Sequence, residues 1–148
     1  MIELNGATLT IDEVVRVCRQ NEQAEIPLEA QTAINHSRAH VEAMLKSGEA
    51  VYGLTTGFGK FSDVRIADED AAELQKNLII SHSCGTGEPL PTEAVRGVML
   101  LRLNALASGF SGIRLSTMET LLQMLNRGVH PLIPEKGSLG ASGDLVPL

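Results

Sequence analysis

The feature that most constrains the fold is a strongly apolar segment from Val95 to Leu106. Its spacing predicts a helix that opens near Pro91 and leaves little polar face, so this helix needs neighbours on nearly every side. Aromatic residues make up only 3% of the chain, and tryptophan is absent. Leucine, valine, isoleucine, alanine and methionine must therefore fill the core around it. A chain of 148 residues is long enough for such a core.

Capping signals and helical periodicity predict the other elements. Thr10 stands three residues before Glu13, which is the pattern of a capping box at the start of a helix. Short apolar stretches around Asn5-Gly6 predict a small hairpin over residues 2–9. The remaining helices are expected at about 11–19, 27–46, 68–81 and 115–126. The predicted fold class is mainly α: a small N-terminal β element, then helices and ordered glycine-rich loops.

The first glycine-rich loop, residues 51–65, does not have the pattern of a nucleotide-binding loop. A P-loop would need glycine where Leu54 stands, and serine or threonine where Phe61 stands. The net charge of −6, with no basic cluster, also disfavours nucleic-acid binding. No apolar run approaches the roughly 20 residues of a membrane helix. These observations disfavour nucleotide binding and nucleic-acid binding, and they do not predict a membrane-spanning helix.

The last loop contains Ala141-Ser142-Gly143 between further glycines and Asp144. Such residues are usual in plain turns. The composition also suits a backbone that cyclises on itself, because Gly143 has no Cβ to crowd attack of its nitrogen on the Ala141 carbonyl carbon. Loss of water after ring closure, and of the Ser142 hydroxyl as a second water, would leave a methylidene-imidazolone electrophile.

Five segments, in order, resemble blocks of the aromatic amino acid ammonia-lyase family. They are residues 51–60, 77–90, 102–109, 128–134 and 137–148. The resemblance implies a cofactor, 4-methylidene-imidazol-5-one (MIO), formed from Ala141, Ser142 and Gly143, with no metal or nucleotide. It implies a larger helical-bundle lyase fold and release of ammonia from a small amino acid.

The resemblance also implies roles for individual residues. Tyr52 would be the catalytic base that removes an unactivated proton beside the substrate ring, with Gly59 and Asp144 in supporting positions. Because phenols titrate near pH ~10, such a base needs neighbouring positive charge or donors. Lys60 and Arg65 are close to it in sequence. On residue type alone, a single tyrosine is more often a packing residue.

By the same resemblance, Ser81 and His82 would lie where members of this family contact the substrate ring. A histidine at a helix end is most often a cap. The Ser-His pair resembles the histidine-acting members, which form the α,β-unsaturated acid urocanate, and an imidazole can hydrogen-bond a substrate imidazole. Thr55 departs from this pattern, because Thr-Thr-Gly is more similar to the phenylalanine-acting form. Phenylalanine or tyrosine ammonia-lyases and aminomutases therefore stay open as alternatives.

The resemblance further implies that residues 1–148 are an N-terminal portion of a longer chain, ending just after the cofactor-forming loop. Other active-site groups would lie in later residues and in further subunits of a homotetramer. A non-catalytic fragment is thus an alternative of another class. Cys18 and Cys84 form no motif, which suggests a reducing cytoplasm. His36, His40 and His130 lack partners at metal-ligand spacing, so no metal site is expected.

Overall fold

The computed structural model describes residues 1–47, 49–57, 66 and 70–137, with the backbone alone at 71 and 72. The elements in chain order are β1 (Ile2–Glu3), α1 (Ile11–Gln20), β2 (Ala24–Glu25), α2 (Leu28–Ser47), α3 (Ala71–His82), β3 (Thr86–Pro89), α4 (Thr92–Ala107), α5 (Leu115–Asn126) and β4 (Pro134–Lys136). The chain divides into two compact units, residues 1–40 with 88–133 and residues 41–87 with 134–148. The mainly helical fold class is confirmed.

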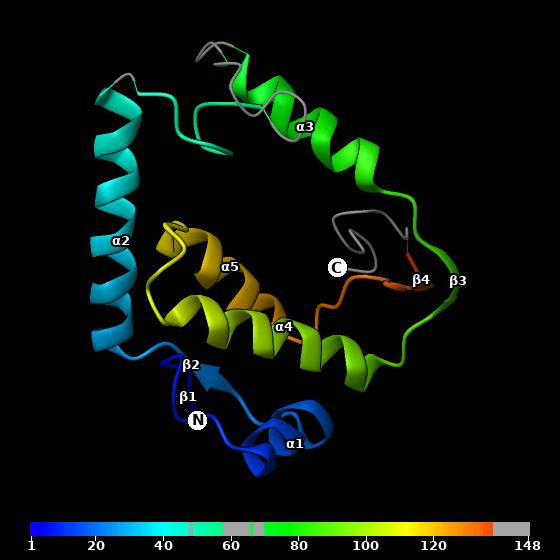
Figure 1. Cartoon of the computed structure of the whole chain (residues 1–148). Helices are drawn as coiled ribbons and strands as arrows, with labels where there is room; N and C mark the ends of the chain where they lie inside the picture. Colours follow the sequence, from blue (N-terminus) through cyan, green and yellow to red (C-terminus); the bar gives the residue numbers. More distant parts are fainter. Residues whose placement is uncertain (48, 58–65, 67–69, 138–148) are drawn as a thin grey trace. The chain divides into compact units, whose positions relative to one another are not determined.

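The core of the first unit forms where α4 packs against α1 and α5 (Figure 1). Fully buried side chains come from all three helices: Val17, Leu100, Leu103, Met118 and Leu125. Burying an aliphatic side chain of this size stabilises a fold by roughly 1.5–3 kcal/mol. The expectation that α4 would be buried on nearly every side is only partly met, because Ala94, Leu101, Arg102 and Ala105 are exposed. Leu101 departs from it, with 53% of its surface exposed.

One charged side chain lies inside this core. Arg96, on α4, is 3% exposed. Its Nε and Nη2 atoms donate to the Val17 carbonyl oxygen in the last turn of α1, at 3.1 and 2.7 Å. Its Nη1 atom donates to the Leu125 carbonyl oxygen in the last turn of α5 at 3.0 Å, and lies 3.0 Å from His130 Nε2. Because helix C-termini carry partial negative charge, both ends suit a buried cation.

The turn between α4 and α5 meets α2 closely. Gly109 has φ +78°, and a Cβ built there would lie 2.8 Å from the Ala33 Cβ. Only glycine fits both that dihedral and that approach. Beyond it, Gly112 donates its N–H to the Ser37 hydroxyl at 3.0 Å. The first half of α2 is thereby fixed to the same unit.

The N-terminal helix begins as the sequence predicts. The Thr10 hydroxyl accepts from the Glu13 N–H at 3.3 Å, and the Glu13 carboxylate accepts from the Thr10 N–H at 2.8 Å. This reciprocal pair is the predicted capping box. The Thr10 backbone and side-chain donors lower the pKa of the Glu13 carboxyl, because they bind its ionised form.

The hairpin predicted around Asn5-Gly6 is wrong. β1 instead pairs in parallel with β2, with Ile2 opposite Ala24. The Asn5 side chain accepts from the backbone N–H of Ala7 at 2.9 Å, which closes a local turn. The Gly6 N–H donates to Asn104 on α4 at 3.0 Å. Asn5-Gly6 therefore turns the chain toward α4 and does not return it along β1.

The second unit contains the end of α2, the loop after it, α3 and β4. β3 pairs with β4, and β4 ends one residue before Gly137. The helix expected from about residue 68 is described from Ala71, and residues 67–69 lie outside the described part. The helices predicted at 27–46 and 115–126 agree closely with α2 and α5.

Arg96→Met should lower the free energy of unfolding by about 2–4 kcal/mol, because two buried carbonyls lose a charged donor. Chemical denaturation of the variant beside the parent measures this. Arg127→Met is the matched control, since that side chain is exposed and its loss should change stability by less than about 0.5 kcal/mol. Equal effects of the two substitutions would contradict the assigned role of Arg96.

Candidate active site

Tyr52 lies in a tight turn that follows α2. The Leu54 N–H donates to the Val51 carbonyl at 3.0 Å, and Gly53 has φ +70°. An i to i+3 hydrogen bond with a positive φ at the third residue is typical of a type II turn. Tyr52 stands at the second position, and its side chain is 63% exposed. The predicted loop is confirmed around Tyr52, with its phenol on the surface of the unit.

Ser81 and His82 form the C-terminal end of α3, as expected for a pair at a helix end. His82 Nδ1 lies 2.6 Å from the Leu78 carbonyl oxygen and 3.0 Å from the Ser81 hydroxyl. The Ser81 hydroxyl itself donates to Leu78 at 2.9 Å. A carbonyl oxygen only accepts, so this contact assigns the proton of the neutral ring to Nδ1.

The tautomer of His82 decides what its ring can offer. With Nδ1 protonated and engaged, Nε2 of the neutral ring is a hydrogen-bond acceptor. An acceptor at this place can receive an N–H from another imidazole, whereas a phenyl ring has no such hydrogen to give. His82 also caps a carbonyl in the last turn of its own helix. The capping role and the recognition role are therefore compatible, because they use different nitrogens.

Several residues singled out in the sequence lie outside the described residues. They are Gly59, Lys60, Arg65, Ala141, Ser142, Gly143 and Asp144. Tyr52 and the Ser81-His82 pair both belong to the second unit, which also includes β4. The roles of all the site residues predicted from the sequence stay predictions.

The other histidines lie on α2 and in the loop after α5. His36 and His40 are exposed on α2, with ring centroids 4.7 Å apart in an edge-to-face arrangement. His130 lies in the loop after α5, against Arg96. In the described part of the chain, no three His, Cys, Asp or Glu side chains gather as metal ligands would. The same part contains no helix long and apolar enough to cross a membrane.

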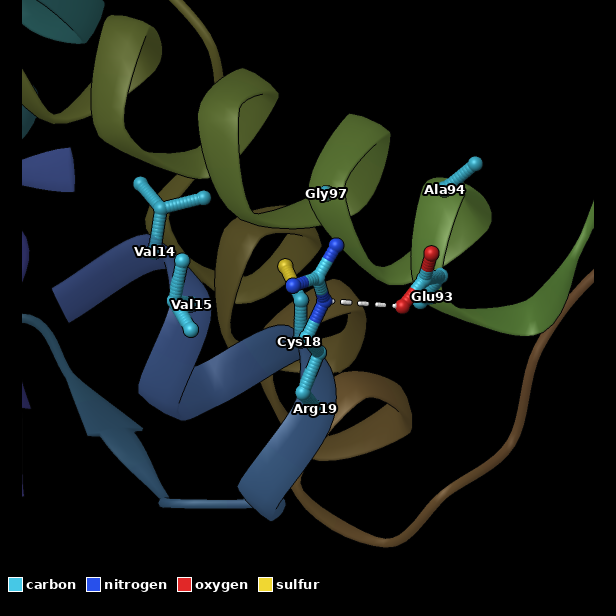
Figure 2. Close-up of a pocket in the computed structure, with 7 residues that line it drawn as sticks. All are labelled: Val14, Val15, Cys18, Arg19, Glu93, Ala94 and Gly97. Atoms are coloured by element: carbon cyan, nitrogen blue, oxygen red, sulfur yellow. Dashed lines mark hydrogen bonds and ion pairs between the residues drawn. The ribbon is translucent and has the colours of Figure 1, made fainter. Parts of the chain in front are cut away.

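A separate cavity of about 220 Å³ lies in the first unit between α1 and α4 (Figure 2). Cys18 points toward it, and the Arg19–Glu93 ion pair, 2.9 Å between Nε and Oε2, lies beside it. Gly97 leaves room opposite the thiol, since a Cβ there would lie 3.6 Å from Cys18 Sγ. Burial raises the pKa of the Cys18 thiol, so little reactive thiolate forms. None of the predicted site residues lines this cavity.

Comparisons with known proteins bear on the whole chain. A family model described as aromatic amino acid lyase matches residues 9–148. A histidine ammonia-lyase of Caldanaerobacter subterraneus subsp. tengcongensis is 58% identical over 99% of this chain. The chain spans 29% of that relative's length.

Solved structures of two further proteins are similar in fold. The histidine ammonia-lyase of Trypanosoma cruzi has a TM-score of 0.85 and 39% identity, with 94% of this chain and 27% of that one covered. The phenylalanine aminomutase of Pantoea agglomerans has a TM-score of 0.90 and 32% identity, with 100% of this chain and 28% of that one covered.

Proposed function

The chain belongs to the aromatic amino acid lyase family, and from this premise we propose that it is the N-terminal portion of an enzyme that releases ammonia from L-histidine. The observation that carries the choice of substrate is the 2.6 Å contact between His82 Nδ1 and the Leu78 carbonyl oxygen. In the neutral ring this contact leaves Nε2 as an acceptor for an imidazole N–H. The 58% identity to a histidine ammonia-lyase supports the same choice. The products would be urocanate and ammonia.

The residues of this chain would divide the reaction between them. Tyr52 takes the proton from the carbon beside the imidazole, and the electron pair of that C–H bond forms the new double bond as the C–N bond breaks. His82 holds the substrate ring. The methylidene-imidazolone that Ala141, Ser142 and Gly143 would form supplies an electrophile for the amine. The triplet fits this chemistry, since it has the hydroxyl to lose and no Cβ at Gly143.

The remaining assignments follow from the family premise. Gly59 and Asp144 would support the tyrosine loop and the cofactor. A homotetramer in the cytoplasm, acting in histidine catabolism, is the setting we propose. Later residues of the full chain and partner subunits would complete the site, since this chain spans 29% of its relative's length.

Two alternatives have observations in their favour. The likeness to a phenylalanine aminomutase, with a TM-score of 0.90, favours a phenylalanine or tyrosine substrate. Thr55 favours it too, because Thr-Thr-Gly is more similar to the phenylalanine-acting form of the family. The short share of the relatives' length favours a non-catalytic fragment. Exposed apolar side chains such as Phe110 and Leu132 also suit a piece that needs partners. So does an apolar groove of about 470 Å³ along α5, which Leu106 of α4 helps to line.

Ser142→Ala, in a full-length lyase that carries this segment, should lower ammonia release by several orders of magnitude. The reason is that the hydroxyl whose departure completes the electrophile is gone. Intact-mass measurement should find two waters lost from the parent and not from the variant. Ser111→Ala, an exposed residue in the turn between α4 and α5, is the matched control and should keep both the mass change and the activity. Near-normal turnover of Ser142→Ala would end the cofactor proposal.

His82→Leu in the same full-length lyase should lower kcat/KM for histidine and raise the relative value for phenylalanine or tyrosine. A lost hydrogen bond of this kind costs roughly 1–3 kcal/mol when it is buried. Competition assays with paired substrates measure the ratio. His40→Leu, an exposed histidine on α2, should leave the ratio unchanged. An unchanged ratio in His82→Leu would reduce His82 to a helix cap.

The isolated 148-residue chain should release no detectable ammonia from histidine and should self-associate. Its exposed apolar surface should exceed the ~600 Å² patch of an ordinary monomer. Analytical ultracentrifugation and thermal melts test this directly. A monodisperse monomer that unfolds cooperatively would contradict it and would make residues 1–148 a complete domain.

A further inference from the structure

The Tyr52 turn is held by the hydroxyls of two residues that follow it, Thr55 and Thr56, here called the threonine pair. Thr55 Oγ1 accepts from the Val51 N–H at 2.8 Å and donates to the Glu49 carbonyl at 2.8 Å. The two residues that the Thr55 hydroxyl contacts both precede Tyr52. Its single hydroxyl therefore joins the entry to the turn with the exit.

The second hydroxyl acts on the other side of Tyr52. Thr56 Oγ1 accepts from the Gly53 N–H at 3.2 Å and donates to the Gly57 carbonyl at 3.0 Å. The amide groups on either side of Tyr52 are thus each bound by one threonine hydroxyl. Tyr52 lies between these two bonded residues, so the hydroxyls hold the path of the backbone that carries it.

The threonine pair is itself fixed within the second unit. Thr56 is only 4% exposed. The Thr55 carbonyl accepts from the Ile66 N–H at 2.9 Å. Both threonines line an enclosed cavity of about 50 Å³, which Leu45 of α2 and Leu74 of α3 help to close. Thr56 is the buried member of the pair, and removing its hydroxyl would leave the Gly53 N–H and the Gly57 carbonyl without that partner.

We infer that Thr55 and Thr56 are positioning residues for the Tyr52 base, acting through the amides of Val51 and Gly53. This rests on the proposed function, in which Tyr52 removes the proton. The inference also gives Thr55 a structural reason that is independent of the substrate ring. Its hydroxyl is engaged by Val51 and Glu49, and this role is compatible with either substrate.

The experiment uses a full-length lyase that carries this segment, with Thr55→Val, Thr56→Val and the matching serine variants. Valine keeps the shape of threonine and removes the hydroxyl, whereas serine keeps the hydroxyl. We expect kcat for histidine to fall about 10- to 100-fold in the valine variants with KM little changed, because a base misplaced by about 1 Å costs up to this factor. The serine variants should recover most of kcat.

An isotope effect separates positioning from general loss of structure. With histidine deuterated at the carbon that loses its proton, the deuterium effect on kcat should rise in the valine variants, because proton transfer becomes more rate-limiting. Thr32→Val is the matched control. It removes a hydroxyl bonded to the Leu28 carbonyl within α2, so kcat and isotope effect should stay at parent values.

The outcomes test the proposed function and the inference about the threonine pair separately. A parent that releases no ammonia from histidine overturns the proposed function, and the inference with it. An active parent whose valine variants keep the parental kcat and isotope effect overturns the inference alone. A fall in kcat that serine does not restore, with an unchanged isotope effect, assigns the pair a purely structural role and also overturns it. If Thr56→Val fails to fold, the Thr55 variants decide.

Discussion

The first unit depends on the hydrogen bonds of one buried guanidinium. Arg96 reaches the last turn of α1 through Val17 and the last turn of α5 through Leu125, while its own helix lies between them. The planar fork of arginine can serve several acceptors in different directions, which the single ammonium of lysine cannot do in the same geometry. Its fourth contact, with His130, adds the loop that carries the chain from α5 toward β4. Leu100 and Leu103 are buried between the helices that Arg96 joins.

The sequence predicted what is local and missed what is distant. The bounds of α5 and the capping box at Thr10 follow from patterns within one or two turns of helix, and both are confirmed. The hairpin at Asn5-Gly6 failed because the same two residues can close a turn of another kind. The partner of β1 lies more than twenty residues away at Ala24, and no local pattern indicates a parallel pair across that distance. Arg96 was missed for the same reason, since its acceptors come from two other helices.

In the candidate site, too, the sequence predicted some features and not others. The positions of Tyr52 in a loop and of His82 at a helix end were readable from the sequence. The tautomer of His82 was not, because it depends on where the Leu78 carbonyl points. The threonine pair offered a signal that could have been used: threonine beside glycine in a turn often bonds to nearby backbone groups. Which amides it would bind could be known only from the folded turn.

The exposed position of Tyr52 has an optical consequence. The chain has one tyrosine and no tryptophan, so near-ultraviolet absorbance and intrinsic emission above the phenylalanine region come from this single side chain. With 63% of its surface exposed, this side chain can be reached by quenchers dissolved in water. A spectrum of the unlabelled 148-residue chain is therefore a measurement of one residue, the proposed base, with no background from the helical core.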